Sequence, residues 1–321
     1  MFLPNPRFRV VFPGKHIKIT GIPIDTIHTA STRIRFFRLL KYLPAGFKSS
    51  LYKDDIECDI LYIQKNARPE IIRAAKTAVQ RKIPVIYDID DDFGVWPGMD
   101  ETGMMNMATA VTTNTPERAA YLKNYTKTPI HIIPDCLDYI EKRNKPVHIN
   151  KSIRSVATFG SNFTISISAA YLNHFPRYLA QSYFCADKSK KVINGNFIKW
   201  RLKPFLKQLK CFDVCLLAQN NDNRGRMKSS NRLLVCMSVG IPAIVSDTPA
   251  YSKIMKELEL NYLIADSPLK INYILELISP VDIRREISSK FFKYAWSNHA
   301  PEAVSNKFAQ LIHNIRNANQ Q

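Results

Sequence analysis

A basic loop in the second half of this chain has the composition of an anion-binding site. The basic and hydroxyl residues of this loop are Arg224, Arg226, Lys228, Ser229 and Ser230. The loop leads into a predicted helix that one of the two serines can cap. Apolar residues recur at helical spacing after it, and Gly240 ends that pattern. Unpaired backbone N–H groups and the helix dipole favour an anion at a helix N-terminus. The loop therefore predicts a site for a phosphorylated ligand.

An acidic cluster follows a predicted strand at residues 84–89, and its members are Asp88, Asp90, Asp91 and Asp92. Three interpretations are open. The carboxylates can face a ligand-binding cleft as acceptor or catalytic groups, or they can form a solvated acidic turn. Carboxylates at a strand end can also hold magnesium or manganese, with Asp90 and Asp92 as the ligands.

The segment 26–43 offers a histidine, His28, in a loop before a predicted helix. His28 can act as the base toward an acceptor or as a sugar contact, and the alternative is a structural loop histidine. The helix is expected over residues 31–43, with Ser31 or Thr32 as its cap.

The apolar side of this helix is predicted to consist of Ile34, Phe37 and Leu40, and its basic side of Arg35, Arg38 and Lys41. The basic side is either simply solvated or, together with Phe36, contacts an anionic membrane surface.

Strands and helices alternate on both sides of these groups. In the first half we expect strands at 7–12, 59–64, 84–89, 108–113 and 130–133, and helices at 31–43, 69–81 and 116–124. The lysine-rich stretch 141–151 is the predicted linker. In the second half we expect strands at 153–159, 183–186, 214–217 and 243–246, and helices at 165–175 and 204–210 and from Asn231 and Pro249, followed by helices at 281–296 and 301–315. Such alternation predicts two Rossmann-like α/β units, whose ligands bind at the carboxyl ends of parallel strands.

Composition excludes several classes of protein. The chain has 321 residues, enough for two domains, and a formal charge of +19 from 46 basic and 27 acidic residues. No apolar run approaches a bilayer span, no secretion signal is visible, and the six cysteines form no CxxC pair. These features indicate a cytoplasmic protein with reduced thiols. The charge attracts polyanions, but the chain has no recognisable nucleic-acid-binding motif, so nucleic acid is not the expected partner.

The stretch from Lys228 onward also resembles a known family. Lys228-Ser229, Leu233-Leu234, Met237, Gly240-Ile241-Pro242 and Ser246-Asp247-Thr248-Pro249-Ala250-Tyr251 are similar, without gaps, to the donor-binding half of GT-B glycosyltransferases related to family 4. The resemblance implies a GT-B fold, with two Rossmann-like domains and a cleft between them. The expected domains are residues 1–145 on the acceptor side and 150–297 on the donor side. A last helix over 298–321 is expected to cross back to the first domain.

The resemblance also implies roles for particular residues. Gly160, Ser161 and Asn162 match the turn that touches the donor phosphates, Ser31 and Arg33 match the border of the cleft, and the loop cations together with Arg232 would neutralise the leaving diphosphate. The family needs no metal for this step and no other cofactor. Two family glutamates are replaced, because Met227 and Val235 stand at their positions.

The implied function is transfer of a sugar, with retention of configuration, from a nucleotide-diphosphate sugar to a glycan or a lipid-linked acceptor. The expected catalytic residues are His28, Asp88 and Asp90, and Asp91 and Asp92 are expected to line the cleft. A lipid-linked acceptor would suit a peripheral location on the inner face of a membrane. Two alternatives are a catalytically inactive GT-B domain that binds a glycan or a partner, and a basic nucleic-acid-binding protein.

Overall fold

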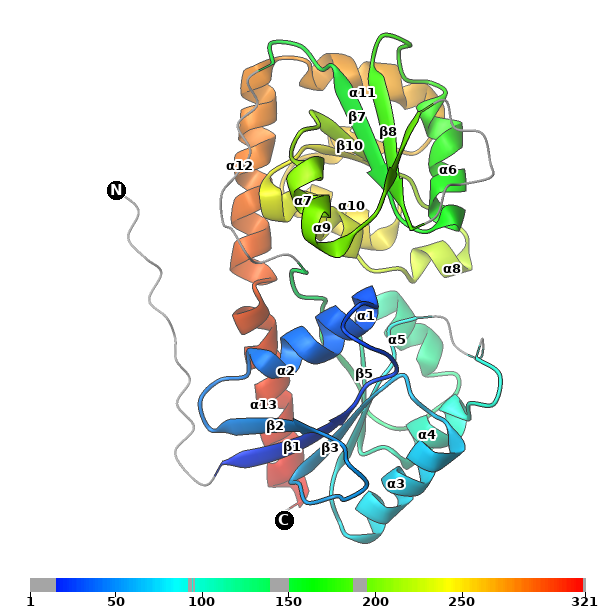
Figure 1. Cartoon of the computed structure of the whole chain (residues 1–321), viewed down its shortest axis with the longest axis vertical. Helices are drawn as coiled ribbons and strands as arrows, with labels where there is room; N and C mark the ends of the chain where they lie inside the picture. The colour runs from blue at the N-terminus through cyan, green and yellow to red at the C-terminus, as the bar shows by residue number, and fades with distance from the viewer. Residues whose placement is uncertain (1–15, 92–93, 95, 139–149, 187–194, 320–321) are drawn as a thin grey trace. The chain divides into compact units, whose positions relative to one another are not determined.

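The computed structural model describes residues 16–91, 94, 96–138, 150–186 and 195–319. The chain forms two compact units, the first from Met1–Cys136 with Pro301–Gln321 and the second from Leu137–Ala300. Each unit contains a parallel six-stranded sheet with helices on both faces (Figure 1). The predicted strand at 7–12 and most of the predicted linker at 141–151 lie outside the described residues.

The first unit is built on a sheet with the strand order β2-β1-β3-β4-β5-β6, and every neighbouring pair is parallel. Its strands are β1 (Ile17–Ile22), β2 (Phe47–Leu51), β3 (Ile60–Gln64), β4 (Val85–Asp88), β5 (Ala110–Thr113) and β6 (Ile130–Ile132). The order reverses between β1 and β3. Ligands of open α/β sheets bind at such a reversal, at the carboxyl ends of the strands.

The two faces of this sheet are covered by different helices. One face carries α1 (Ala30–Thr32), the π-helical segment η1 (Arg33–Arg38), α2 (Leu39–Lys41) and the last helix, α13 (Pro301–Asn319). The other carries α3 (Pro69–Gln80), α4 (Glu101–Met107) and α5 (Pro116–Leu122). Successive residues of β3 alternate between the two cores: Tyr62 packs with the first group of helices and Ile63 with the second. This is the period of two that a strand buried on both faces requires.

The segment from α1 to α2 differs from the predicted amphipathic helix. Its start has no side-chain cap hydrogen bond, because Thr29 is the cap residue and its hydroxyl donates to Asp25 instead. In η1 the residues Arg33, Ile34, Arg35 and Phe36 are all buried in succession.

This burial corrects the predicted basic side of the helix. Arg35 is 3% exposed and Phe36 is 1% exposed, so neither can reach a membrane surface in this structure. A wider turn changes the angular spacing of side chains, which is why spacing by 3.6 residues assigned Arg35 to the wrong side. Only Lys41 of the three predicted basic residues is exposed.

The last helix is part of the first unit although it follows the second in sequence. Val304, Phe308, Leu311, Ile312 and Ile315 of α13 pack in the core that also contains β1, β3 and η1. The Ser305 hydroxyl donates to the Leu39 carbonyl at 2.8 Å, and the rings of Phe308 and Tyr62 lie 4.9 Å apart. Helix α13 therefore closes one face of a sheet formed by the other end of the chain.

The second unit has the strand order β12-β11-β10-β7-β8-β9, again parallel throughout. Its strands are β7 (Ser155–Phe159), β8 (Ala180–Cys185), β9 (Asn196–Lys199), β10 (Val214–Leu217), β11 (Ala243–Ser246) and β12 (Ile264–Ala265). The order reverses between β7 and β10. The buried strand residues and the helices that flank them form one large core.

The helices of this unit are α6 (Asn162–Leu172), α7 (Leu202–Leu209), α8 (Asn223–Arg226), α9 (Asn231–Val239), α10 (Pro249–Glu257), α11 (Ile271–Ile278) and α12 (Val281–Asn298), with the 3₁₀ turns η2 (Asn261–Leu263) and η3 (Pro268–Lys270). Gly240 ends α9 in the left-handed conformation, at φ 70°, as the sequence predicts for a helix-stopping glycine. The strands predicted at 214–217 and 243–246 are confirmed residue for residue. Several described elements were not predicted, namely β1, β2, β9, β12, α4, α8, α11 and the turns η2 and η3.

Candidate active site

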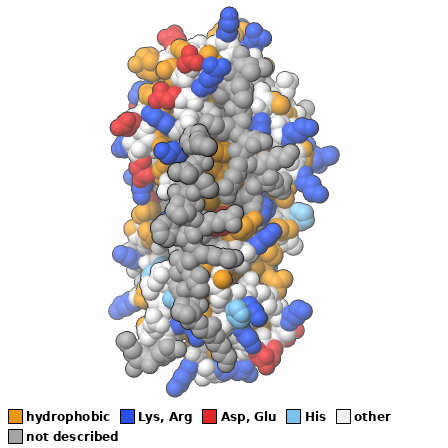
Figure 2. Space-filling view, turned by 90° about the vertical axis from the view of Figure 1, so that its left-hand side faces the viewer, with side chains coloured by type: hydrophobic (Ala, Val, Ile, Leu, Met, Phe, Trp, Pro, Cys, Tyr) orange, Lys and Arg blue, Asp and Glu red, His pale blue; other side chains and the backbone are white. Residues whose placement is uncertain are grey.

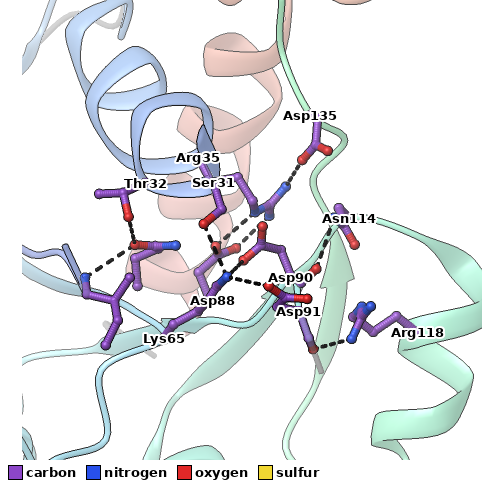
Figure 3. Close-up of polar contacts among 12 residues, drawn as sticks. Ser31, Thr32, Arg35, Lys65, Asp88, Asp90, Asp91, Asn114, Arg118 and Asp135 are labelled. Atoms are coloured by element: carbon purple, nitrogen blue, oxygen red, sulfur yellow. Dashed lines mark hydrogen bonds and ion pairs between the residues drawn. The ribbon is translucent and has the colours of Figure 1, made fainter. Parts of the chain in front are cut away.

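In the first unit, a buried ion-pair network lies at the carboxyl ends of β3 and β4 (Figure 3). Arg35 of η1 donates to both oxygens of Asp88, at 2.9 Å and 2.5 Å, and to Asp135 Oδ1 at 2.9 Å. The Thr112 hydroxyl donates to Asp88 Oδ1 at 2.7 Å. Burial by itself lowers the pKa of Arg35, but the surrounding carboxylates, Asp88 foremost, raise it well above its usual value.

The contacts of Asp88 within this network are structural. Its side chain is fully buried, and both of its oxygens accept from Arg35. Asp88 thus fixes η1 to the end of β4. A catalytic role for Asp88 stays a prediction.

A second cation, Lys65, joins three of the predicted cleft residues. Its Nζ lies 3.0 Å from Asp90 Oδ1, 3.4 Å from Asp91 Oδ2 and 3.2 Å from Ser31 Oγ. Lys65 directly follows β3 and has a φ of 55°, which is unusual for a residue other than glycine. The ammonium group therefore holds the acidic turn against the start of α1.

Asp90 is a carboxylate of this group whose pKa is shifted. Burial raises the pKa of Asp90, and the nearby charges of Lys65 and Arg35 oppose that rise only in part. The backbone of the same turn is fixed by Asn114, whose Nδ2 donates to the Asp90 carbonyl at 3.4 Å, and by Arg118, which donates to the Asp91 carbonyl. A carboxylate with a raised pKa, held rigidly at a strand end, is suited to proton transfer.

The loop between β1 and α1 presents His28 to solvent. Arg33, which is 1% exposed, donates to the carbonyls of Ile27 and His28 at 2.9 Å and 3.1 Å. Arg33 therefore does not line a surface as expected, but positions the loop that carries the histidine. Asp92 lies outside the described residues, and among those described no group of three or more His, Cys, Asp or Glu side chains is arranged to hold a metal ion.

In the second unit, the turn after β7 requires its glycine. Gly160 has a φ of 150°, and an added Cβ would lie 2.8 Å from the Thr164 methyl group. The Ser161 hydroxyl caps α6 by accepting from Thr164 N at 3.4 Å. Asn162 is exposed and its Oδ1 accepts from the Cys185 thiol at 3.1 Å. The turn from β7 thus packs closely against the first turn of α6, as in a phosphate-binding turn.

Arg232 lies across the point where the strand order reverses. Its Nη1 donates to the Phe159 carbonyl at the end of β7, at 3.3 Å. Its Nη2 donates to the Ala218 carbonyl after β10 at 2.8 Å and to Gln219 Oε1 at 2.5 Å. A permanent positive charge is therefore fixed at the ends of the two strands that flank the reversal.

The basic loop forms a tight turn between β10 and α9. Asp222 caps α8 by accepting from Gly225 N at 2.7 Å, and a Cβ on residue 225 would lie 1.8 Å from the Asn220 carbonyl oxygen. Arg224 and Arg226 are exposed, and Lys228 and Ser229 are half-buried. Ser230 occupies the cap position of α9, but its side chain makes no cap hydrogen bond, contrary to expectation.

The two positions at which glutamates are absent differ in environment. Val235 is 6% exposed and belongs to the core of the second unit, whereas Met227 is half-buried in the basic loop. Position 235 therefore serves packing in this chain.

Sequence reasoning missed several polar residues of both sheets. Lys65 was not considered, Arg35 was assigned to a membrane-facing side, and Gln219, Asp247 and Asp266 were not singled out. All but Arg35 lie just beyond the carboxyl end of a parallel strand. Scanning for polar side chains directly after buried strands would have found them.

The positive charge of the chain is not gathered on the face that Figure 2 shows, where the described Lys and Arg side chains are scattered among other types. None of the described helices has the length and hydropathy needed to cross a bilayer.

Comparison with known proteins supports the fold. No family model and no curated protein matches the chain. Among solved structures, the chain is similar to OtsA without ligand (TM-score 0.62, 9% identity, 93% of this chain and 99% of that one). It is also similar to WaaG, described as a glycosyltransferase involved in lipopolysaccharide biosynthesis (TM-score 0.57, 13% identity, 92% and 99%). A third match is TarM (TM-score 0.57, 13% identity). The match covers 79% of this chain and 54% of TarM.

The chain thus spans about half the length of TarM and nearly all of the matched chains of ligand-free OtsA and of WaaG. At these identities the similarity establishes the fold, which is GT-B, with two Rossmann-like domains. The predicted fold class is confirmed. Membership of family 4 stays a prediction.

Proposed function

We propose that this chain is a glycosyltransferase that binds a nucleotide-diphosphate sugar on its second unit and a glycan or lipid-linked acceptor on its first. The observation that carries the proposal is the reversal point of the second sheet. There a glycine turn, the fixed charge of Arg232 and the basic loop surround the ends of two parallel strands. The matched structures, among them a glycosyltransferase of lipopolysaccharide biosynthesis, support the same function.

The proposed chemistry places the leaving diphosphate against protein cations. Negative charge develops on the diphosphate as the sugar departs, and preorganised donors stabilise such charge best where water is excluded. Arg232 is preorganised by its three acceptors, and Arg224, Arg226 and Lys228 add charge nearby. On the first unit, His28 and Asp90 are the proposed groups for proton transfer at the acceptor hydroxyl. We further propose retention of configuration.

Binding of nucleotides tests the donor site. In a Lys228→Ala variant we expect the affinity for the preferred nucleoside diphosphate to fall by about 1–3 kcal/mol, as when a charge-assisted hydrogen bond is lost. Calorimetric titration with UDP, GDP and ADP measures this. Lys253→Ala, which removes an exposed lysine from α10, is the matched control and should bind like the parent protein. Equal affinity in both variants would place the diphosphate elsewhere.

The proposal also includes independence from divalent metal. The carboxylates of the acidic turn already contact protein cations, since Lys65 contacts Asp90 and Asp91 and Arg35 contacts Asp88. We therefore expect sugar transfer to persist in excess EDTA. Loss of turnover with EDTA and its recovery on adding manganese would instead assign the turn to a metal site.

An inactive GT-B domain that binds a glycan or partner is the second candidate, and the burial of Val235 favours it. A hydrophobic residue packed in the core occupies the position of one family glutamate. Slow hydrolysis of a nucleotide sugar by the purified protein separates the two candidates, since only a catalytic site releases the nucleotide.

A further inference from the structure

The second unit contains a small polar pocket that the proposed diphosphate site does not use. Its volume is about 210 Å³, and it lies at the carboxyl ends of β10, β11 and β12, beside α6. Pockets for drug-sized ligands usually have volumes of roughly 300 Å³ or more, so this smaller pocket suits a single ring. The residues that matter for recognition are Tyr171, Gln219, Asn220, Ser246, Asp247 and Asp266.

Two carboxylates of the pocket each have one oxygen in use. Asp247 Oδ1 accepts from the Ser252 hydroxyl at 2.5 Å, and Asp266 Oδ2 accepts from Lys270 Nζ at 2.6 Å. The second oxygen of each has no hydrogen-bonding partner among the described residues. Both remain strong acceptors for a ligand that carries hydroxyl groups.

A third group, Ser246, is buried without a partner. Its residue is 3% exposed, and its hydroxyl makes no hydrogen bond to any described residue. A buried hydroxyl without a partner destabilises the structure, and a ligand hydroxyl would supply the missing hydrogen bond. Gln219 is oriented by Arg232, which donates to its Oε1, so that its NH₂ group stays available.

We propose that this pocket binds an uncharged pyranose ring. Sugar hydroxyls both donate and accept, which matches two carboxylates, a serine hydroxyl and an oriented amide, while Tyr171 and Ile167 offer apolar surface to the ring. The carboxylates exclude anionic sugars such as uronates, because like charges repel at short distance. The inference rests on the proposed function for the source of the ring, which is either the sugar of the donor or a residue of a glycan acceptor.

The experiment compares three kinds of probe by calorimetric titration. These are nucleoside diphosphates (UDP, GDP, ADP), the corresponding nucleotide hexoses and hexuronates, and free methyl hexosides. The variant is Asp266→Asn, whose ion pair with Lys270 is half exposed, so that the fold should survive. The control is Asp282→Asn on α12, which removes a carboxylate from a more exposed ion pair with Arg285, outside the pocket.

If the ring belongs to the donor, a nucleotide hexose binds more tightly than its nucleoside diphosphate. We expect this gain in affinity to fall about 10- to 150-fold in Asp266→Asn and not in the control, which is the range for losing a hydrogen bond to a charged group. The hexuronate should bind poorly to the parent protein and improve in the variant. If the ring belongs to a glycan, the methyl hexosides show the same loss instead.

Equal sugar affinities in Asp266→Asn and Asp282→Asn would overturn the inference, as would a parent protein that binds no sugar in either form. Failure of the proposed function looks different. In that case no nucleotide binds, while methyl hexosides still bind in a manner that depends on Asp266.

Discussion

Arg35 determines how the carboxyl edge of the first unit is arranged. It brings Asp88 at the end of β4 and Asp135 beyond β6 onto one guanidinium group, and it also donates to the Ile133 carbonyl at 2.8 Å. Buried charges are tolerated only when they are paired and hydrogen-bonded. The turn that carries Asp90 follows β4 directly, so its position depends on this pairing.

Replacing Arg35 by Ala should therefore leave two buried carboxylates without their cation. We expect the free energy of unfolding of the first unit to fall by about 3–5 kcal/mol, the usual cost of breaking a buried ion pair from one side. Urea unfolding measures the change. Lys41→Ala, an exposed cation on the same helical segment, is the control and should cost less than about 0.5 kcal/mol. Similar losses in the two variants would mean that Arg35 is not a structural residue.

Asp213 does a comparable task in the second unit, where it precedes β10. Its carboxylate accepts from Arg154 N at 2.9 Å, from Ser155 N and Oγ at 3.0 Å, and from Asn150 Nδ2 at 3.0 Å. Burial raises the pKa of Asp213, but these hydrogen bonds outweigh it and lower the pKa below its usual value. A lowered pKa means that the ionised form stabilises the folded state.

The pH dependence follows from that sign. The stabilisation is complete above the usual carboxyl pKa of about 3.9 and is lost as the pH falls through the lower value of the folded state. In Asp213→Asn, we expect unfolding of the second unit to be easier by about 1–3 kcal/mol at pH 7. Its stability should also depend less on pH below about pH 4 than that of the parent. Thermal melting across this range tests both points, with the exposed Asp282→Asn as control. Parallel pH curves for all three proteins would rule out the assignment.

At the scale of elements, the sequence predicts the strands and helices whose apolar residues form a regular pattern. β10 and β11 are four-residue runs of buried side chains, and α10 and α12 begin at the predicted residues. β2 was missed because four of its five residues are exposed and its three central residues are all polar, so the strand shows no apolar alternation. A strand at a sheet edge needs no continuous apolar run.

The segment η1 shows a different limit. Its π-helical geometry buries four residues in succession, and the Tyr62 hydroxyl donates to the Arg35 carbonyl within it at 2.8 Å. That partner lies on β3, so tertiary contacts determine the geometry and local periodicity does not reveal it. The same reason explains the site residues. The position of Gly160 after a strand could be predicted, whereas the pairing of Asp88 with Arg35 depends on two elements, β4 and η1, that are distant in sequence.

At the scale of the whole molecule, each unit has its own core, although the first is discontinuous in sequence. Phe308 on α13 and Phe291 on α12 are both fully buried and lie on successive helices, yet they belong to different cores. Helix α12 therefore stabilises the second unit, whereas the next helix in the chain, α13, stabilises the first. Substitutions at these two residues should separate the units energetically.

We expect Phe308→Ala to destabilise the first unit by about 3–5 kcal/mol and Phe291→Ala to destabilise the second by a similar amount, because each leaves a cavity in one core. Hydrogen exchange followed by mass spectrometry on the full chain reads both units at once. Faster exchange in β1 and β3 with Phe308→Ala, and in β7 and β10 with Phe291→Ala, is the expected pattern. Lys307→Ala, which removes an exposed neighbour on α13, should leave exchange unchanged in both sheets. If Phe308→Ala instead accelerated exchange mainly in β7 and β10, α13 would be stabilising the second unit and the discontinuous first unit would be wrong.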